Sequence, residues 1–136
     1  MRKFLIAAHG SFSSGIKSSL EIIIGKVENV FIIDAYVDGN KSIEDDFNTI
    51  LTNVQVEDEL VVFSDLMGGS ITNQILRNGL RENVHVVTGM NLPLLLDVML
   101  ADADTPVTDV IENAISIARE QVVYVNKIIN KENDHD

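Results

Sequence analysis

The chain has 136 residues, no cysteine and a formal net charge of −11. Its hydrophobic fraction of 46% and charged fraction of 23% are typical of a globular protein, and the length fits one domain. The lack of cysteine excludes disulfides and cysteine-bound metals, while the acidic balance argues against binding to nucleic acid or to anionic lipid.

The first predicted element is a β-strand at residues 4–8, where a short apolar run follows a charged start. The run is too short for the apolar segment of a signal peptide. No stretch of the chain approaches the roughly 18 apolar residues that a membrane span needs. We therefore expect a soluble cytoplasmic protein without direct membrane binding.

Amphipathic segments and short apolar runs then alternate along the chain. Apolar residues at helical spacing predict helices at residues 16–27, 43–54, 71–80, 92–100 and 105–118. The apolar runs between and after them predict further strands at residues 30–35, 60–64, 84–88 and 122–125. Ser42 is suited to cap the second helix, and Pro93 lies in the first turn of the fourth.

The order of these elements predicts a doubly wound α/β fold. The strands are apolar throughout rather than alternating, which is typical of parallel strands that are buried on both faces. Repeated strand–helix alternation then predicts a mostly parallel four-stranded sheet in the order 2-1-3-4, with helices on both faces. We expect one domain over residues 1–126 and a polar C-terminal tail over residues 127–136.

The loops that follow the first and third strands are the expected functional loops. In open α/β sheets, ligands bind beyond the carboxyl ends of the strands, where the strand order reverses. In the predicted order, the first loop begins at His9 and faces the third loop, which holds Asp65. A lone histidine in a turn is more often inert than functional, but this position at the edge of the sheet favours function.

His9 and Asp65 form a candidate pair for nucleophilic chemistry. A neutral imidazole nitrogen can attack phosphorus, provided that the other ring nitrogen carries the hydrogen and donates it to an acceptor. The carboxylate of Asp65 is a suitable acceptor, because it would fix the tautomer and stabilise the positive charge that develops on the ring. Read by itself, Asp65 could equally be an ordinary turn aspartate.

A glycine-rich turn in the third loop offers a phosphate-binding site. Gly68 and Gly69 allow a close approach of a ligand to the backbone, and Ser70 stands at the start of a predicted helix. An acidic chain must hold phosphate with such local donors rather than with a basic field. Ser11 and Ser13 are expected to be turn or cap residues, although either could reach a bound phosphate.

Other function classes remain to be weighed. The chain has neither the Gly-x-Gly-x-x-Gly pattern of a nicotinamide enzyme nor a P-loop, and no histidine–carboxylate cluster has convincing metal spacing. A receiver-like domain phosphorylated on Asp65 would need acidic magnesium ligands after the first strand, where His9 stands instead. A non-catalytic binding module stays open.

Three motifs together resemble a known family. They are His9-Gly10, the segment at residues 64–70 with its Gly-Gly-Ser turn, and the Gly-x-Asn-x-Pro pattern at residues 89–93. The chain resembles the IIA component of the mannose-family (mannose, fructose and sorbose type) sugar phosphotransferase system, from the first strand to about Val125. The resemblance implies a cytoplasmic phosphotransferase that needs no metal or cofactor.

The resemblance also implies partners and roles for the residues. His9 would accept phosphate on Nε2 from phosphorylated HPr and pass it to a histidine of a IIB component, with the membrane components IIC and IID involved only indirectly. Asp65 would orient His9, while Gly69 and Ser70 would hold the phosphate. A homodimer that exchanges the strand at residues 122–125 is implied as well.

Two departures from the family pattern affect these expectations. Ile71 stands where many relatives have proline after Gly-Gly-Ser, so the start of that helix could differ. Many relatives carry a fused IIB domain, so a separate IIB protein is expected here. The phosphoryl-donor subunit of dihydroxyacetone kinase shares the fold and the histidine, but it lacks the Gly-Gly-Ser and Gly-x-Asn-x-Pro patterns and is the second choice.

Overall fold

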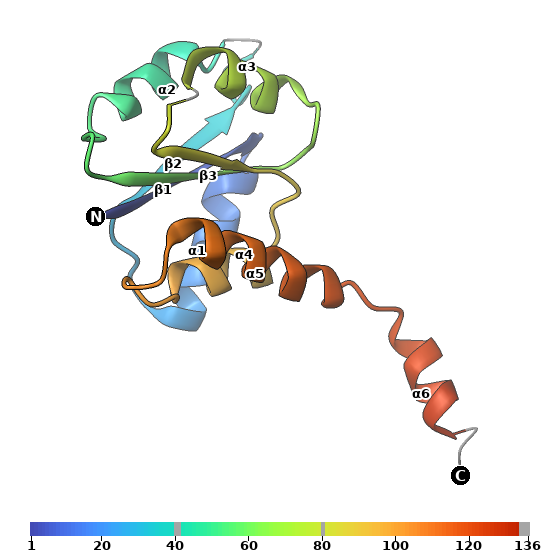
Figure 1. Ribbon diagram of the computed structural model, residues 1–136. Helices are drawn as coiled ribbons and strands as arrows, with labels where there is room; N and C mark the ends of the chain where they lie inside the picture. Colours follow the sequence, from blue (N-terminus) through green and yellow to red (C-terminus); the bar gives the residue numbers. More distant parts are fainter. Residues whose placement is uncertain (40–41, 80, 134–136) are drawn as a thin grey trace. The chain divides into compact units, whose positions relative to one another are not determined.

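The computed structural model describes residues 1–39, 42–79 and 81–133. The elements in chain order (Figure 1) are β1 (Arg2–His9), α1 (Phe12–Ile24), β2 (Val30–Ala35), α2 (Glu44–Leu51), β3 (Glu59–Ser64), α3 (Ser70–Gly79), β4 (Val84–Val87), α4 (Leu92–Met99), α5 (Val107–Glu120) and α6 (Val125–Asn133). The chain forms two compact units, Met1–Leu92 and Pro93–Asp136. The first unit holds the sheet, and the described elements of the second are helices.

The four strands form one parallel sheet in the order β2-β1-β3-β4, so the predicted order and direction are confirmed. Within the first unit, α1 packs on one face of the sheet, and α2 and α3 pack on the other (Figure 1). Most residues of the central strands β1 and β3 are buried, which explains why their sequences are apolar without alternation.

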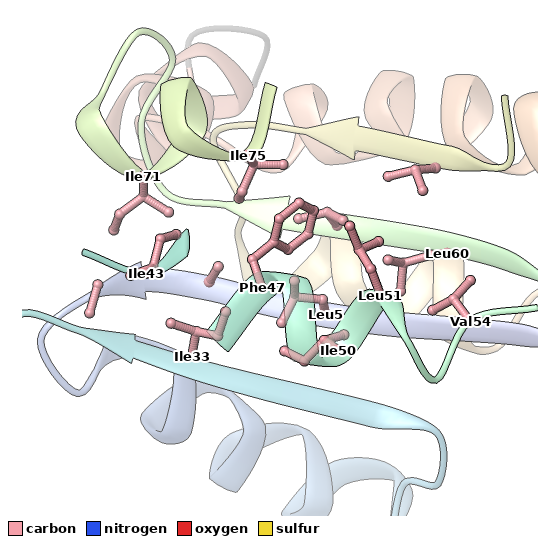
Figure 2. Close-up of a cluster of buried hydrophobic side chains, with 14 residues drawn as sticks. Leu5, Ile33, Ile43, Phe47, Ile50, Leu51, Val54, Leu60, Ile71 and Ile75 are labelled. Carbon is pink, nitrogen blue, oxygen red and sulfur yellow. The ribbon is translucent and has the colours of Figure 1, made fainter. Parts of the chain in front are cut away.

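A cluster of buried hydrophobic side chains fills the space between the sheet and α2 with α3 (Figure 2). Leu5 and Leu60 point into it from the sheet, and Phe47 and Ile75 reach it from the two helices. On the opposite face, the rings of Phe4 and Phe63 stack with their centroids 6.4 Å apart. Buried hydrophobic side chains thus pack on both faces of the sheet.

The helix ends differ in detail from the predicted ones. Gly25, at a φ of 83°, ends α1 before the predicted position, and its N–H donates to the Glu21 carbonyl. The Ser42 hydroxyl accepts the Glu44 N–H as predicted for a cap, although it stands one position further from the helix than the N-cap. The third helix ends at Gly79, and Leu80 lies outside the described residues.

The C-terminal segment corrects two predictions. The structure has no strand at residues 122–125, because residues 122–124 are irregular and Val125 begins α6. A strand needs a neighbouring strand for its backbone hydrogen bonds, and this segment has none in the described chain. The expected polar tail is also helical as far as Asn133, since Val125, Ile128 and Ile129 follow helical spacing. Residues 134–136 lie outside the described part.

Asp58, directly before β3, gives a test of pH-dependent stability. Its carboxylate accepts the Gln55 N–H at 2.9 Å and pairs with the Lys3 ammonium at 3.0 Å. These contacts lower its pKa from 3.8 to about 2. A lowered pKa stabilises the fold above the unfolded value, and this contribution is lost as the pH falls through the folded value.

We therefore expect Asp58→Asn to lower the free energy of unfolding at neutral pH, and the difference from the native chain to shrink between about pH 4 and pH 2. Urea denaturation followed by circular dichroism measures both. Glu57→Gln, at an exposed neighbouring position, removes the same charge and should change little. A difference that does not vary with pH would contradict the role of the ion pair.

Candidate functional site

The candidate site lies at the carboxyl edge of the sheet, where β1 and β3 end. His9 is the last residue of β1, and Asp65 follows the last residue of β3. The register pairs Ala7 with Ser64, so Asp65 leaves β3 beside the end of β1, while Ala35 of β2 pairs with His9 on the other side. The two loops lead to helices on opposite faces, which makes this the switch point of the sheet.

The structure brings His9 and Asp65 into direct contact. The Asp65 Oδ2 atom lies 2.7 Å from His9 Nδ1 and also accepts the backbone N–H of His9 at 2.9 Å. An ionised carboxylate only accepts hydrogen bonds, so Nδ1 carries the hydrogen of the neutral ring. The Nε2 atom then keeps a free lone pair, on a side chain that is 43% exposed.

The carboxylate of Asp65 is held firmly in its ionised form. Burial raises the pKa of Asp65, but hydrogen bonds from the His9 backbone and ring outweigh it, so the pKa lies below its usual value. The Leu66 N–H donates to the other oxygen at 3.0 Å. Asp65 therefore stays a negatively charged acceptor next to the ring at neutral pH.

The turn between Asp65 and α3 approaches the imidazole closely. A Cβ atom on Gly69 would lie 3.2 Å from the Leu66 Cβ and 3.9 Å from the His9 Cε1. Gly68 adopts a φ of 73°, in the left-handed region that favours glycine. The Thr72 hydroxyl donates to the Leu66 carbonyl at 2.8 Å and thereby ties the turn to the helix. This geometry explains why two glycines stand here.

Replacing Gly68 or Gly15 by alanine should change the free energy of unfolding in opposite directions. Gly68→Ala forces a side chain into the left-handed region, and we expect it to destabilise the fold by about 1 kcal/mol. Gly15 lies inside α1 with nothing within 4 Å of an added Cβ. Gly15→Ala should therefore stabilise the fold by about 0.5–1 kcal/mol. Urea denaturation measures both changes in the free energy of unfolding. Two changes in the same direction would contradict the left-handed conformation described for Gly68.

Sequence reasoning missed one residue of the site, Tyr36. It follows β2, and its ring centroid lies 5.5 Å from that of His9. Its hydroxyl lies 2.8 Å from the Ser70 Oγ and accepts a hydrogen bond from the Gln74 amide at 3.0 Å. The signal available was its place: the loop after the second strand opens on the same edge of the sheet as the first and third loops.

The two candidate serines of the first loop lie in different environments. Ser11 is exposed at the N-cap position of α1, and its side chain makes no capping hydrogen bond. Ser13 is fully buried, and its hydroxyl has no hydrogen-bond partner within the described residues. The prediction that Ser13 reaches a bound phosphate therefore requires its hydroxyl to become accessible.

The loop after β4 contacts the end of β3 and the loop that follows it. The Met90 N–H donates to the Ser64 carbonyl at 3.0 Å, directly before Asp65. The Thr88 hydroxyl contacts the Met67 sulfur at 3.7 Å, and Gly89 adopts a φ of 67°. The first part of the Gly-x-Asn-x-Pro pattern thus helps to fix the backbone that carries the site.

The arrangement can perform one kind of chemistry well. The neutral ring of His9 presents the lone pair of Nε2, and the first N–H groups of α3 lack intrahelical acceptors next to the Gly-Gly-Ser turn. Within residues 1–39, 42–79 and 81–133, no three histidine or acidic side chains form a metal-binding group. In the same residues, no helix is long and apolar enough to span a bilayer.

The comparisons with known proteins agree on one family. The family model described as "PTS system fructose IIA component" matches residues 3–115. The fructose-specific EIIA component of Bacillus subtilis (strain 168) is 21% identical over 133 residues, which cover 96% of this chain and 91% of that protein. The mannose-specific EIIAB component of Escherichia coli (strain K12) is 28% identical over 87% of this chain, which spans 38% of that protein's length.

Solved structures give the same result. A Klebsiella pneumoniae protein, provisionally named a phosphoenolpyruvate-dependent sugar phosphotransferase system permease, has a TM-score of 0.87 and 31% identity, covering 94% of this chain and 93% of that one. The phosphotransferase component EIIA of Streptococcus agalactiae has a TM-score of 0.75 and 28% identity, covering 93% and 99% of the two chains.

Proposed function

The chain belongs to the mannose-type IIA family of the sugar phosphotransferase system, and we propose that it carries the phosphoryl group of that system on Nε2 of His9. Membership of the family implies phosphoryl transfer in sugar uptake. The observation that carries the proposal is the 2.7 Å contact between Asp65 Oδ2 and His9 Nδ1, which places the hydrogen of the neutral ring on Nδ1 and keeps the Nε2 lone pair free, on a side chain that is 43% exposed. The proposed IIA domain spans residues 1–126.

The proposed reaction is an in-line transfer between two nitrogens. The Nε2 lone pair of His9 forms a bond to phosphorus while the bond from phosphorus to the donor's nitrogen breaks. The hydrogen on Nδ1 stays in place, and Asp65 stabilises the positive charge that the ring gains. The Ser70 hydroxyl and the N–H groups at the start of α3 stabilise the equatorial oxygens of the transferred group. Positioning and charge stabilisation are what this chemistry mainly requires, so no metal or cofactor is proposed.

The proposed partners are proteins. Phosphorylated HPr is the donor, a histidine of the cognate IIB component is the acceptor, and the IIC and IID membrane components act only downstream. Three apolar side chains near His9 are strongly exposed and suit the docking of such partners: Phe12 at 48%, Leu66 at 58% and Met67 at 82%. Since HPr is a cytoplasmic protein, the proposed location is the cytoplasm.

A homodimer is the proposed assembly. The C-terminal segment exposes several apolar side chains: Val122 at 83%, Val123 at 43%, Tyr124 at 72% and Val125 at 57%. A second copy could cover this segment, and it could also supply the strand edge that residues 122–125 lack in the single chain. Sedimentation equilibrium of the native chain, compared with a Val123→Asp variant, tests this assembly.

A labelling assay tests the proposed function. The native chain is incubated with radiolabelled phosphoenolpyruvate, enzyme I and HPr, and the label is expected to be acid-labile and alkali-stable, as in phosphohistidine. Labelling by acetyl phosphate that requires magnesium and is lost in Asp65→Asn would support a receiver-like domain instead. The structure disfavours that alternative, because both oxygens of Asp65 already accept hydrogen bonds. A chain that takes no label by either route would be a binding module.

A further inference from the structure

Tyr36 occupies a conformation that a tyrosine rarely adopts. Its φ is 64°, in the left-handed region, where a side chain with a Cβ is disfavoured. Strained positions of this kind persist only where the surrounding contacts hold them, and they cluster at functional sites. Tyr36 packs partly against the hydrophobic cluster, and its ring also contacts His9 while its hydroxyl lies between Ser70 and Gln74.

The hydrogen bonds of Gln74 determine which group donates and which accepts between Gln74, Tyr36 and Ser70. Gln74 is buried at 8% exposure, and its Oε1 accepts the backbone N–H of Ile43 at 3.1 Å and the Ser42 hydroxyl at 2.9 Å. A backbone N–H can only donate, so the oxygen of the amide must face Ile43. The amide nitrogen therefore faces Tyr36 and donates to its hydroxyl oxygen at 3.0 Å.

The same reasoning extends to Ser70. The hydroxyl oxygen of Tyr36 accepts from Gln74, so its single hydrogen is available to the Ser70 Oγ at 2.8 Å. When Tyr36 donates, the hydrogen of the exposed Ser70 hydroxyl is left for another acceptor. A phosphoryl oxygen on His9 is such an acceptor, and Tyr36 contacts both His9 and Ser70.

We propose that Tyr36 is a positioning residue for phosphoryl transfer at His9, because its ring packs against the imidazole and its hydroxyl orients Ser70 as a donor. This inference rests on the proposed function of His9 and goes beyond it. The ring restricts the rotation of the imidazole. The hydroxyl, held by Gln74, turns the Ser70 hydrogen toward the transferred group.

The test compares Tyr36→Phe, Ser70→Ala and the double variant. Phenylalanine keeps the ring and removes only the hydroxyl. The single-turnover rate of transfer from phosphorylated HPr to His9 is measured for each, together with thermal unfolding. Because a neutral hydrogen bond is lost, we expect Tyr36→Phe to be about 3- to 10-fold slower. Ser70→Ala should be slowed at least as much, and the double variant should be no slower than Ser70→Ala alone.

A hydroxyl on the outer face of α1 provides the control. Ser19 is exposed and its hydroxyl donates to the Gly15 carbonyl at 3.4 Å, so Ser19→Ala also removes a hydroxyl and its rate should equal that of the native chain. The non-additivity of Tyr36→Phe with Ser70→Ala is the readout that a merely structural role would not produce. It separates an action through Ser70 from a general loosening of the fold.

The outcomes separate the inference from the proposed function. If Tyr36→Phe or Ser70→Ala accepts phosphate at the native rate, the inference is overturned and the proposed function is left intact. Independent, additive losses in the double variant would also overturn it, because the hydroxyl would then not act through Ser70. A native chain that accepts no phosphate would overturn both.

Discussion

Replacing His9 by alanine is expected to reduce phosphoryl transfer from phosphorylated HPr by at least about 1,000-fold, to background. The reason is that the proposed bond forms at Nε2 of this ring. His9 is also the side chain whose Nδ1 hydrogen is held by a partly buried, ionised carboxylate. The measurement is the acid-labile label on the variant after incubation with phosphoenolpyruvate, enzyme I and HPr.

His85 provides the control for this experiment. It lies near the start of β4, and its Nε2 atom is 2.6 Å from the Glu59 Oε2 at the start of β3. Both residues stand at the amino ends of their strands, the opposite edge of the sheet from His9. His85→Ala should therefore keep the native rate of labelling. Equal labelling of His9→Ala and the native chain would refute the proposed nucleophile.

The sheet and the central pair of the site could be predicted from the sequence for one physical reason. Parallel strands covered on both faces are apolar throughout, so β1 and β3 are visible as runs, and their carboxyl ends must meet at one edge. His9 and Asp65 each stand directly after such a run. Their contact follows from the strand order, which the alternation of strands and helices strongly limits.

Tyr36 could not be predicted in the same way. Its contribution depends on a left-handed backbone conformation and on a hydroxyl that reaches Ser70 and Gln74 on α3. Neither property is encoded in a local pattern of apolar residues. Its neighbours in the sequence predict only a loop, and the side chains that it contacts lie more than 25 positions away.

At the C-terminal segment, the sequence predicted a strand that the structure does not contain. Residues 122–125 are β-branched or aromatic and therefore resemble a strand. Strand formation depends on a partner strand, whereas the spacing of Val125, Ile128 and Ile129 suits a helix, whose backbone hydrogen bonds lie within its own segment. In the single chain the helical pattern prevails from Val125 onward.

The Asp65→Asn variant is expected to slow phosphorylation of His9 by at least about 100-fold while the fold is kept. The native carboxylate accepts three N–H groups, from the His9 backbone, the His9 ring and Leu66. An amide has one oxygen, so its NH₂ group must face at least one of these donors. If it faces the ring, it donates to Nδ1 and moves the hydrogen to Nε2, which blocks the attack.

Asp34→Asn is the matched control for that variant, because it removes the same charge in β2, where Asp34 pairs with Ala8. The Asp34 Oδ1 atom accepts the Ser14 N–H at 3.0 Å, and an asparagine oxygen can replace it as the acceptor. Its rate should therefore stay within about threefold of native. Nitrogen NMR of the His9 ring then separates the causes: a native ring with hydrogen on Nδ1 and a variant ring with hydrogen on Nε2 would assign the loss to the tautomer. A variant that keeps the native tautomer and the native rate would show that Asp65 does not orient His9.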